Sequence, residues 1–423
     1  MGSDLETVLV ISNSNAGDRS GKGIIEKYVI PLLVAADISY DYHQTKTTQQ
    51  TGELARQHLA RSTAPIVVAG GDGTVHEILN LVSLGGHAPT THAINPFSLI
   101  LIPAGTANAL YASFWPPSTS DIVSHRLLPQ NVPQDVAYKL QSVFSFIEKK
   151  SPPYPLSIAL AQTYSDITAS AESCSRTISC VVASTSLHAA ILHSAEKYRS
   201  SIPGIERFKV AARENIDKWS NARVELLPIS SSDPVLIYDP VQKHLTPCSE
   251  KGSVSLDGPF FYFLSTVNVD RLEPKFVITP LAKTSPPASE GAFDIVVVRP
   301  ARKPKYDGNT DEERAALAEM AMEWFDQVYN GGEHIHYTYP AEEGADPVYV
   351  TEYFRAGGWN WYPEVYQSSR NCFWCAEFLH RVPMSFRNVS ALMGPCYKYL
   401  KVATQKSRLC LQESCVAPIS GFR

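Results

Sequence analysis

A glycine-rich stretch at residues 70–74 carries the residue types in this chain that are best suited to chemistry. Gly70, Gly71, Asp72, Gly73 and Thr74 follow the apolar run IVVA and precede the helical pattern VHEILNLVSL. Glycines between a strand and a helix let the backbone approach a ligand closely, and the free N–H groups at a helix start attract phosphate. A carboxylate in such a loop suits a proton acceptor or a metal contact. The stretch therefore predicts a phosphate site that contains a reactive carboxylate.

The same residues also have a purely structural interpretation. Thr74 and Glu77 match the capping-box pattern, so Asp72 or Thr74 could cap the helix while the glycines form a tight turn. The stretch matches neither the P-loop pattern nor G-x-G-x-x-G. We favour the phosphate site because so many special residues follow one buried strand. For Glu77, capping and site roles both stay open.

Two further loops repeat the order of strand, glycine turn and helix. Asn13 and Gly17 follow the apolar run TVLVIS, and Gly105, Thr106 and Asn108 follow SLILIPA. The carboxyl ends of parallel strands share one edge of a sheet, and open α/β sheets bind ligands at that edge. The three loops together predict a nucleotide pocket.

Alternating strand and helix patterns are the elements that must position these loops. Over the first 115 residues this alternation predicts a Rossmann-like parallel sheet in an α/β nucleotide-binding domain. After proline-rich breaks the chain becomes strand-rich, with helical segments near 194–218 and 311–330. We predict an α/β domain at residues 1–130, a mainly antiparallel β-sandwich domain at 131–365, and a C-terminal tail of uncertain structure at 366–423.

Composition limits the class of protein. The 423 residues carry a formal net charge of -5, which argues against a nucleic-acid-binding protein with a basic face. The chain has no run of 18 apolar residues, so we expect no transmembrane helix. Its first residues do not match the pattern of a signal peptide. The uneven placement of its eight cysteines favours a reducing, cytoplasmic compartment. The C-x-x-C spacing at 372–375 stands alone, so free thiols are favoured over zinc or redox chemistry.

Taken together, the three loops resemble the catalytic domain of the diacylglycerol kinase family, which includes sphingosine kinases, ceramide kinases and bacterial lipid kinases. The segments NSNAG at 13–17, GGDGTVHE at 70–77 and PAGTAN at 103–108 stand where this family has N-P-x-[SG]-G, G-G-D-G-T and P-x-G-T-x-N. The stretch SAEKYRSSIPGIERF at 194–208 is similar to one in the sphingosine kinase branch. The resemblance runs from residue 7 to about 360 and implies an α/β domain related to phosphofructokinase and NAD kinase.

The resemblance implies that a lipid hydroxyl attacks the γ-phosphate of ATP, with Mg²⁺ bridging the phosphates. Asp72 would accept the proton of the hydroxyl, and no residue is assigned as a metal ligand. The strand-rich domain would hold the lipid, most simply a sphingoid base, and membrane contact would be peripheral. The residues that the resemblance assigns to the nucleotide are Asn13, Gly17, Gly70, Gly71, Gly73, Thr74, Glu77, Gly105, Thr106, Asn108, Arg199 and Arg207. The alternative, that the two arginines are ordinary surface residues of a helix, stays open but is less favoured.

The sequence departs from the family pattern at several positions. Ser14 replaces the proline of the first loop, and Glu290 stands where aspartate is usual. Ala190 lies where the sphingosine kinase branch has an acidic residue that meets the substrate amine. The family's late D-G segment, which helps to hold Mg²⁺, is not found after Asp346. The acceptor could therefore be a neutral lipid, and catalysis could be impaired.

These departures leave three alternatives to a sphingoid-base kinase. A diacylglycerol kinase would fit the missing acid at Ala190. A nucleotide- or lipid-binding protein without catalysis would fit the missing D-G segment. An NAD kinase shares the G-G-D-G-T loop, but the segments NSNAG and PAGTAN argue against it.

Overall fold

The computed structural model describes most of the chain, in segments. The described residues are 7–84, 97–117, 128, 132–149, 152–164, 174–202, 204–248, 252–287, 291–308, 310–340, 344–364, 384–388 and 400–403. The C-x-x-C pair at 372–375 and Glu290 lie outside the described residues, as does most of the predicted tail.

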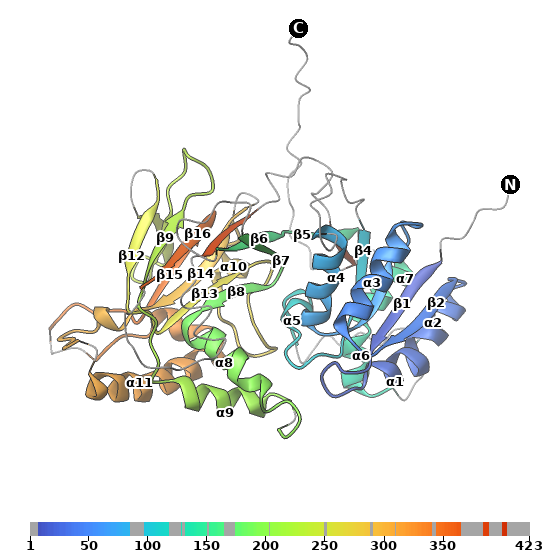
Figure 1. Ribbon diagram of the computed structural model, residues 1–423, viewed down its shortest axis with the longest axis horizontal. Coiled ribbons are helices and arrows are strands. Elements are labelled where there is room, and N and C mark those ends of the chain that lie inside the picture. Colours follow the sequence, from blue (N-terminus) through green and yellow to red (C-terminus); the bar gives the residue numbers. More distant parts are fainter. Residues whose placement is uncertain are drawn as a thin grey trace, which may run out of the picture.

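The N-terminal part is an α/β unit built on one six-stranded sheet (Figure 1). Its spatial order is β2 (Tyr40–Thr45), β1 (Val8–Asn13), β3 (Ile66–Gly70), β4 (Phe97–Pro103), β18 (Leu400–Ala403) and β5 (Pro153–Leu156). All neighbours pair in parallel except β5, which runs antiparallel to β18. The predicted Rossmann-like parallel sheet is confirmed.

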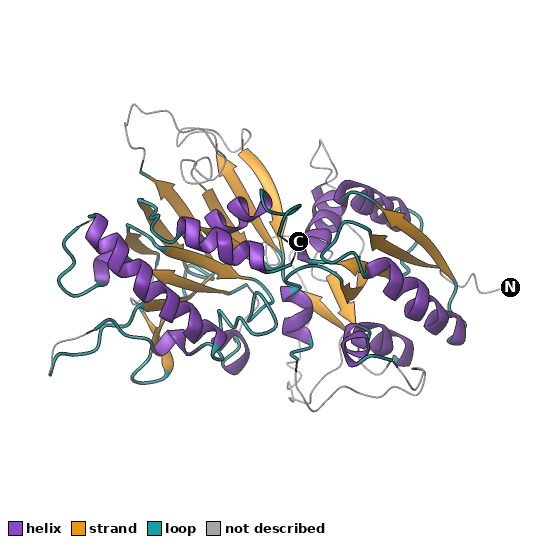
Figure 2. Ribbon diagram, turned by 90° about the horizontal axis from the view of Figure 1, so that it is seen from below, coloured by secondary structure: helices purple, strands orange, loops and turns teal. Residues whose placement is uncertain are grey.

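Helices cover both faces of this sheet (Figure 2). They include α1 (Gly21–Ile24), the π-helical η1 (Ile25–Val29), α2 (Ile30–Ala35), α3 (Thr48–Leu59), α4 (Asp72–Leu84), α5 (Ala109–Phe114), α6 (Gln134–Lys139) and α7 (Gln141–Glu148). Successive strand residues point to opposite faces, and every residue of β1 is buried because both faces are covered. Val8 and Val10 pack with η1 and α7, whereas Leu9 and Ile11 pack with α3 and α4.

The second unit contains two antiparallel sheets. One has the order β11 (His244–Pro247), β10 (Leu236–Asp239), β15 (Thr351–Ala356), β14 (Phe293–Val298), β13 (Tyr262–Thr266) and β8 (Val182–Thr185). The other has the order β12 (Val254–Asp257), β9 (Ala222–Leu227), β16 (Gly358–Pro363), β17 (Met384–Asn388), β6 (Ala159–Tyr164) and β7 (Cys174–Ser179). The predicted antiparallel β-sandwich is confirmed.

Alternation along the strands also explains the two cores of this unit. Phe263 packs between the sheets with Trp359 and Trp361, while its neighbours Tyr262 and Leu264 face a helical layer. That layer is formed by α8 (Ser186–Glu196), α9 (Glu206–Asn215) and α11 (Asp311–Tyr329), which lie along one side of the sandwich in Figure 1.

The two units meet along α4 and α5. Asn80 on α4 accepts a hydrogen bond from the N–H of Ile178 at 2.7 Å and donates to its carbonyl at 2.8 Å. Ile178, Cys180 and Val269 of the second unit belong to the same apolar cluster as α4. The domain boundaries at residues 130 and 365 stay predictions, although α6 and α7, which follow residue 130, pack on the first sheet. Within the described residues, no helix is long and apolar enough to cross a bilayer.

Candidate functional site

The loops that follow β1, β3 and β4 pack directly on one another. A Cβ atom on Gly17 would lie 2.3 Å from the carbonyl oxygen of Ala104, and Gly17 has a φ of +50°. A Cβ atom on Gly105 would lie 2.3 Å from the Cα atom of Gly71. No side chain larger than hydrogen fits between these backbones, so the structure brings the three predicted loops together only because glycine occupies these positions.

Polar side chains hold the loops in place. Asn13 is buried, and its Nδ2 donates to Thr74 Oγ1 at 3.3 Å, which joins the first loop to the second. Asn108 has a left-handed φ of 56°, and its side-chain amide bonds both the N–H of Gly105 at 2.8 Å and its carbonyl at 2.9 Å. Asparagine suits this position because it tolerates that conformation and offers both a donor and an acceptor.

The carboxylate of Asp72 lies at the start of the next helix in space. Its Oδ2 accepts a hydrogen bond from the N–H of Ala109 at 2.8 Å, and its Oδ1 accepts one from Leu110 at 3.0 Å. These N–H groups belong to the first turn of α5 and have no partner within that helix. Asp72 therefore caps α5, which is a different helix from the one that the sequence pattern suggested.

The environment of Asp72 favours a proton-accepting role. Burial raises the pKa of Asp72 above its ordinary value, although the N–H groups of Leu110 and Ala109 act in the opposite direction. Cys180, from the turn between β7 and β8, is close enough that the Asp72 charge adds to burial in raising the thiol pKa to about 12. A carboxylate with a raised pKa, held at a junction of loops, can take a proton from a nearby hydroxyl.

Gly73 and Gly70 differ in what surrounds them. A Cβ atom on Gly70 would lie 2.6 Å from Thr74 Oγ1, so the fold itself requires glycine there. A Cβ atom on Gly73 would meet nothing within 4 Å, and Gly73 is exposed at the start of α4. Glu77 lies one turn further along α4 and is half-buried. Open space beside the first turn of a 13-residue helix is a suitable place for a phosphate.

An arginine from the second unit reaches the third loop. Arg207 on α9 is only 8% exposed, and its Nη2 donates to Thr106 Oγ1 at 3.3 Å. Its Nε has no hydrogen-bond partner among the described residues. Burial, followed by the charge of Arg199, lowers the pKa of Arg207. Arg199 itself is mostly exposed and pairs with Glu196 at 2.6 Å. Two neighbouring guanidinium groups, one with an unused donor, would be stabilised by an anion.

The sequence patterns missed the contributions of the second unit. Cys180 lies near Asp72, and Asn80 is hydrogen-bonded to Ile178. Both contacts join the two units, so the spacing of residues within a short segment could not have indicated them. Within the described residues, no group of three or more His, Cys, Asp or Glu side chains could hold a metal ion.

The N-terminal part of the chain is similar in sequence to known proteins. Residues 7–138 match the family model of the diacylglycerol kinase catalytic domain. Sphingosine kinase 1 of Homo sapiens is 32% identical over 106 residues, which are 25% of this chain and 27% of that protein, so the match spans about a quarter of the relative.

Solved structures from Bacillus anthracis str. Sterne are similar over a longer part of the chain. A putative diacylglycerol kinase has a TM-score of 0.46 at 15% identity, covering 92% of this chain and 94% of its own. A second diacylglycerol kinase has a TM-score of 0.44 at 14% identity, covering 92% and 96%. Residues 7–138 are therefore similar to the diacylglycerol kinase catalytic domain, and 106 residues of the chain are similar to part of a sphingosine kinase.

Proposed function

We propose that this protein transfers the γ-phosphate of ATP to the hydroxyl group of a lipid, with a sphingoid base or a related lipid as acceptor. The observation that carries the proposal is the position of Asp72, whose carboxylate is held by two N–H groups where the glycine loops meet. The similarity of residues 7–138 to the diacylglycerol kinase catalytic domain supports the same reaction class. Asp72 would accept the hydroxyl proton as the oxygen attacks phosphorus.

The nucleotide would lie across the loops, with its phosphates beside Gly73 and the first turn of α4. The open space at Gly73 and the unused Nε of Arg207 both fit a negatively charged ligand. Asn13, Gly17, Gly70, Gly71, Thr74, Gly105, Thr106 and Asn108 would shape the pocket, and Glu77 and Arg199 would line its edge. Mg²⁺ would supply charge neutralisation on the phosphates, and we propose that these phosphates, and not a protein cage, hold it.

A neutral acceptor such as diacylglycerol is the second candidate. Ala190 is buried on α8, and the only carboxylate of that helix is Glu196 at its end, which pairs with Arg199. A protonated amine would find no carboxylate on the earlier turns of α8. Either lipid would be reached at a membrane surface, so we propose a cytoplasmic protein that associates peripherally with membranes.

The test is transfer of labelled γ-phosphate from ATP with Mg²⁺ to sphingosine, ceramide, diacylglycerol and NAD. We expect a labelled lipid with the native chain, and loss of label with Asp72→Asn at unchanged ATP affinity. Asp239→Asn is a matched control, because Oδ1 of Asp239 also accepts two backbone N–H groups, at 2.8 and 3.0 Å, on the hairpin between β10 and β11.

Each outcome of this assay decides between the alternatives. Label in NAD alone would replace the lipid kinase by an NAD kinase. ATP binding without label in any acceptor would favour a binding protein that has lost catalysis. Equal label with Asp72→Asn and Asp239→Asn would refute the role of Asp72 as the proton acceptor.

A further inference from the structure

The short helix α5 connects Asp72 to the second unit. It has six residues, Ala109–Phe114, and all but the last are buried. Its first turn donates the two N–H groups that Asp72 accepts. A helix this short is not stable alone, so its position is set by the apolar cluster in which Ala109, Leu110 and Tyr111 are buried and by the groups that hold its two ends.

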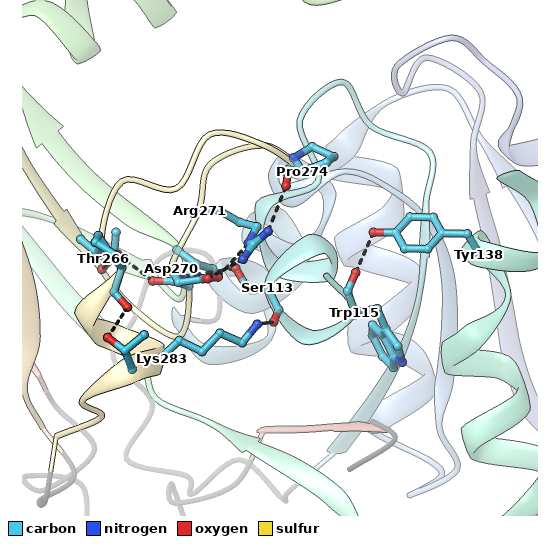
Figure 3. A network of polar contacts seen from close by, with 12 residues as sticks. Ser113, Trp115, Tyr138, Thr266, Asp270, Arg271, Pro274 and Lys283 are labelled. Carbon is cyan, nitrogen blue, oxygen red and sulfur yellow. Dashed lines mark hydrogen bonds and ion pairs between the residues drawn. The ribbon is translucent and has the colours of Figure 1, made fainter. Parts of the chain in front are cut away.

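The far end of α5 is held from both units (Figure 3). In the first unit, the hydroxyl of Tyr138 donates to the carbonyl oxygen of Trp115, which follows α5, at 2.8 Å. The second unit contacts Ser113. Lys283 Nζ donates to the carbonyl oxygen of Ser113 at 3.1 Å. The N–H of Asp270 donates to Ser113 Oγ at 3.3 Å. Both contacts lie at the C-terminal end of α5, where carbonyl groups lack helical partners and a positive charge is favoured.

The segment that presents Lys283 is itself well fixed. The carboxylate of Asp270 forms a two-pronged ion pair with Arg271, at 3.0 and 2.7 Å, and Arg271 also donates to the carbonyl of Pro274 at 2.9 Å. The N–H of Thr279 donates to the carbonyl of Asp270 at 3.0 Å. Lys283 lies on α10 (Leu281–Thr284), so its amine contacts α5 from a segment that these hydrogen bonds hold in place.

The charges near the amine of Lys283 come from this same loop. Partial desolvation of the amine lowers the pKa of Lys283, although much of the side chain is exposed; the charge of Asp270 opposes this change and that of Arg271 adds to it. Desolvation disfavours the charged form of the amine, and the hydrogen bond to the Ser113 carbonyl stabilises that form by accepting one of its protons.

We propose that Lys283 is a positioning residue of the kinase: by holding the Ser113 carbonyl it fixes α5, and the first turn of α5 then fixes the carboxylate of Asp72. The proposal rests on the proposed function. The helix is about 9 Å long and transmits a displacement at one end to the other as a rigid body. The unit that would hold the lipid thereby sets the direction of the carboxylate that would take the lipid's proton.

The experiment compares Lys283→Met, Lys283→Arg and the control Lys275→Met. Both lysines are exposed, and the contact that the experiment tests is the one from Lys283 to the Ser113 carbonyl. We expect Lys283→Met to lower kcat by about 10- to 100-fold, the cost of a displacement near 1 Å at a reacting group. The Kd for ATP should stay within about twofold, because the nucleotide contacts lie on other loops. Lys283→Arg should recover most of kcat, since arginine also donates to a carbonyl.

Hydrogen exchange at the amides of Ala109 and Leu110 gives a readout that does not depend on turnover. We expect faster exchange at both amides in Lys283→Met and no change in Lys275→Met. Ser113→Ala removes only the hydroxyl acceptor and should give a smaller change in the same direction; it replaces Lys283→Met as the test if that variant does not fold.

Unchanged exchange at Ala109 and Leu110 would overturn the inference, whatever the activity. A fall in ATP affinity equal to the fall in kcat would also overturn it, because a general loss of structure would then explain both. If the native protein labels no lipid, the proposed function fails on its own, while the exchange data still decide whether Lys283 positions Asp72.

Discussion

The substitution Gly73→Ala tests whether glycine is needed at this position by the fold or by a bound ligand. A Cβ atom at this position meets no other atom within 4 Å, and Gly73 is the second residue of α4. Alanine is the better helix former, so the substitution should leave the free energy of unfolding unchanged or raise it by up to about 1 kcal/mol.

The same substitution should damage nucleotide binding. A phosphate oxygen that accepts from the first-turn N–H groups must approach the backbone to about 2.9 Å, and a methyl group at Gly73 occupies that approach. Loss of one charge-assisted hydrogen bond costs about 1.5–3 kcal/mol, which raises the Kd for ATP about 10- to 100-fold.

Calorimetric titration with ATP and Mg²⁺, together with urea unfolding, measures both quantities. Gly23→Ala is the matched control, because Gly23 is also helical and exposed and its Cβ would meet nothing within 4 Å. Gly23→Ala should leave the Kd for ATP unchanged and, like Gly73→Ala, leave the free energy of unfolding unchanged or raise it by up to about 1 kcal/mol. Gly105→Ala should lower the free energy of unfolding and raise the Kd for ATP, because its Cβ would lie 2.3 Å from the backbone of Gly71 and the loops would have to separate.

Two results would refute this reasoning. If Gly73→Ala binds ATP as tightly as Gly23→Ala, the phosphates do not approach the start of α4. If Gly73→Ala is less stable than the native protein, the fold needs this glycine after all.

Three further predictions concern charged groups. Arg207→Met should raise the Kd for ATP about 10- to 100-fold, measured by the same titration, because it removes the unused donor; an unchanged Kd would exclude Arg207 from the site. Arg355→Met should lower the free energy of unfolding in urea by about 3–5 kcal/mol, because the buried carboxylate of Asp294, 2.7 Å from the guanidinium, loses its partner. Adding Asp294→Asn should recover part of that loss, and no recovery would contradict the ion-pair explanation. Phosphate transfer should be present above the pKa of Asp72 and fall as the pH drops through it; since burial raises that pKa, the acid limb of the pH–rate profile should lie above about 3.9, and a limb below that value would contradict the role.

Local sequence patterns were sufficient to predict much of the fold and the position of the candidate site. The runs IVVA and SLILIPA became β3 and β4, and their glycine loops lie at one edge because parallel strands end on the same side. The strand-rich pattern after the proline-rich breaks likewise indicated the antiparallel sandwich. The capping interpretation of Asp72 was incomplete, because the carboxylate does cap a helix, but one that starts at Ala109.

The sequence by itself determined which residues could bind phosphate and take a proton, because glycine spacing and strand period are local properties. Only the tertiary structure decided what surrounds them. Asp72 finds its N–H donors 37 and 38 positions later, Arg207 meets Thr106 across 101 positions, and Lys283 meets Ser113 across 170. The physical reason is that such pairs form when buried apolar faces pack, and that packing depends on the whole chain and not on any local pattern.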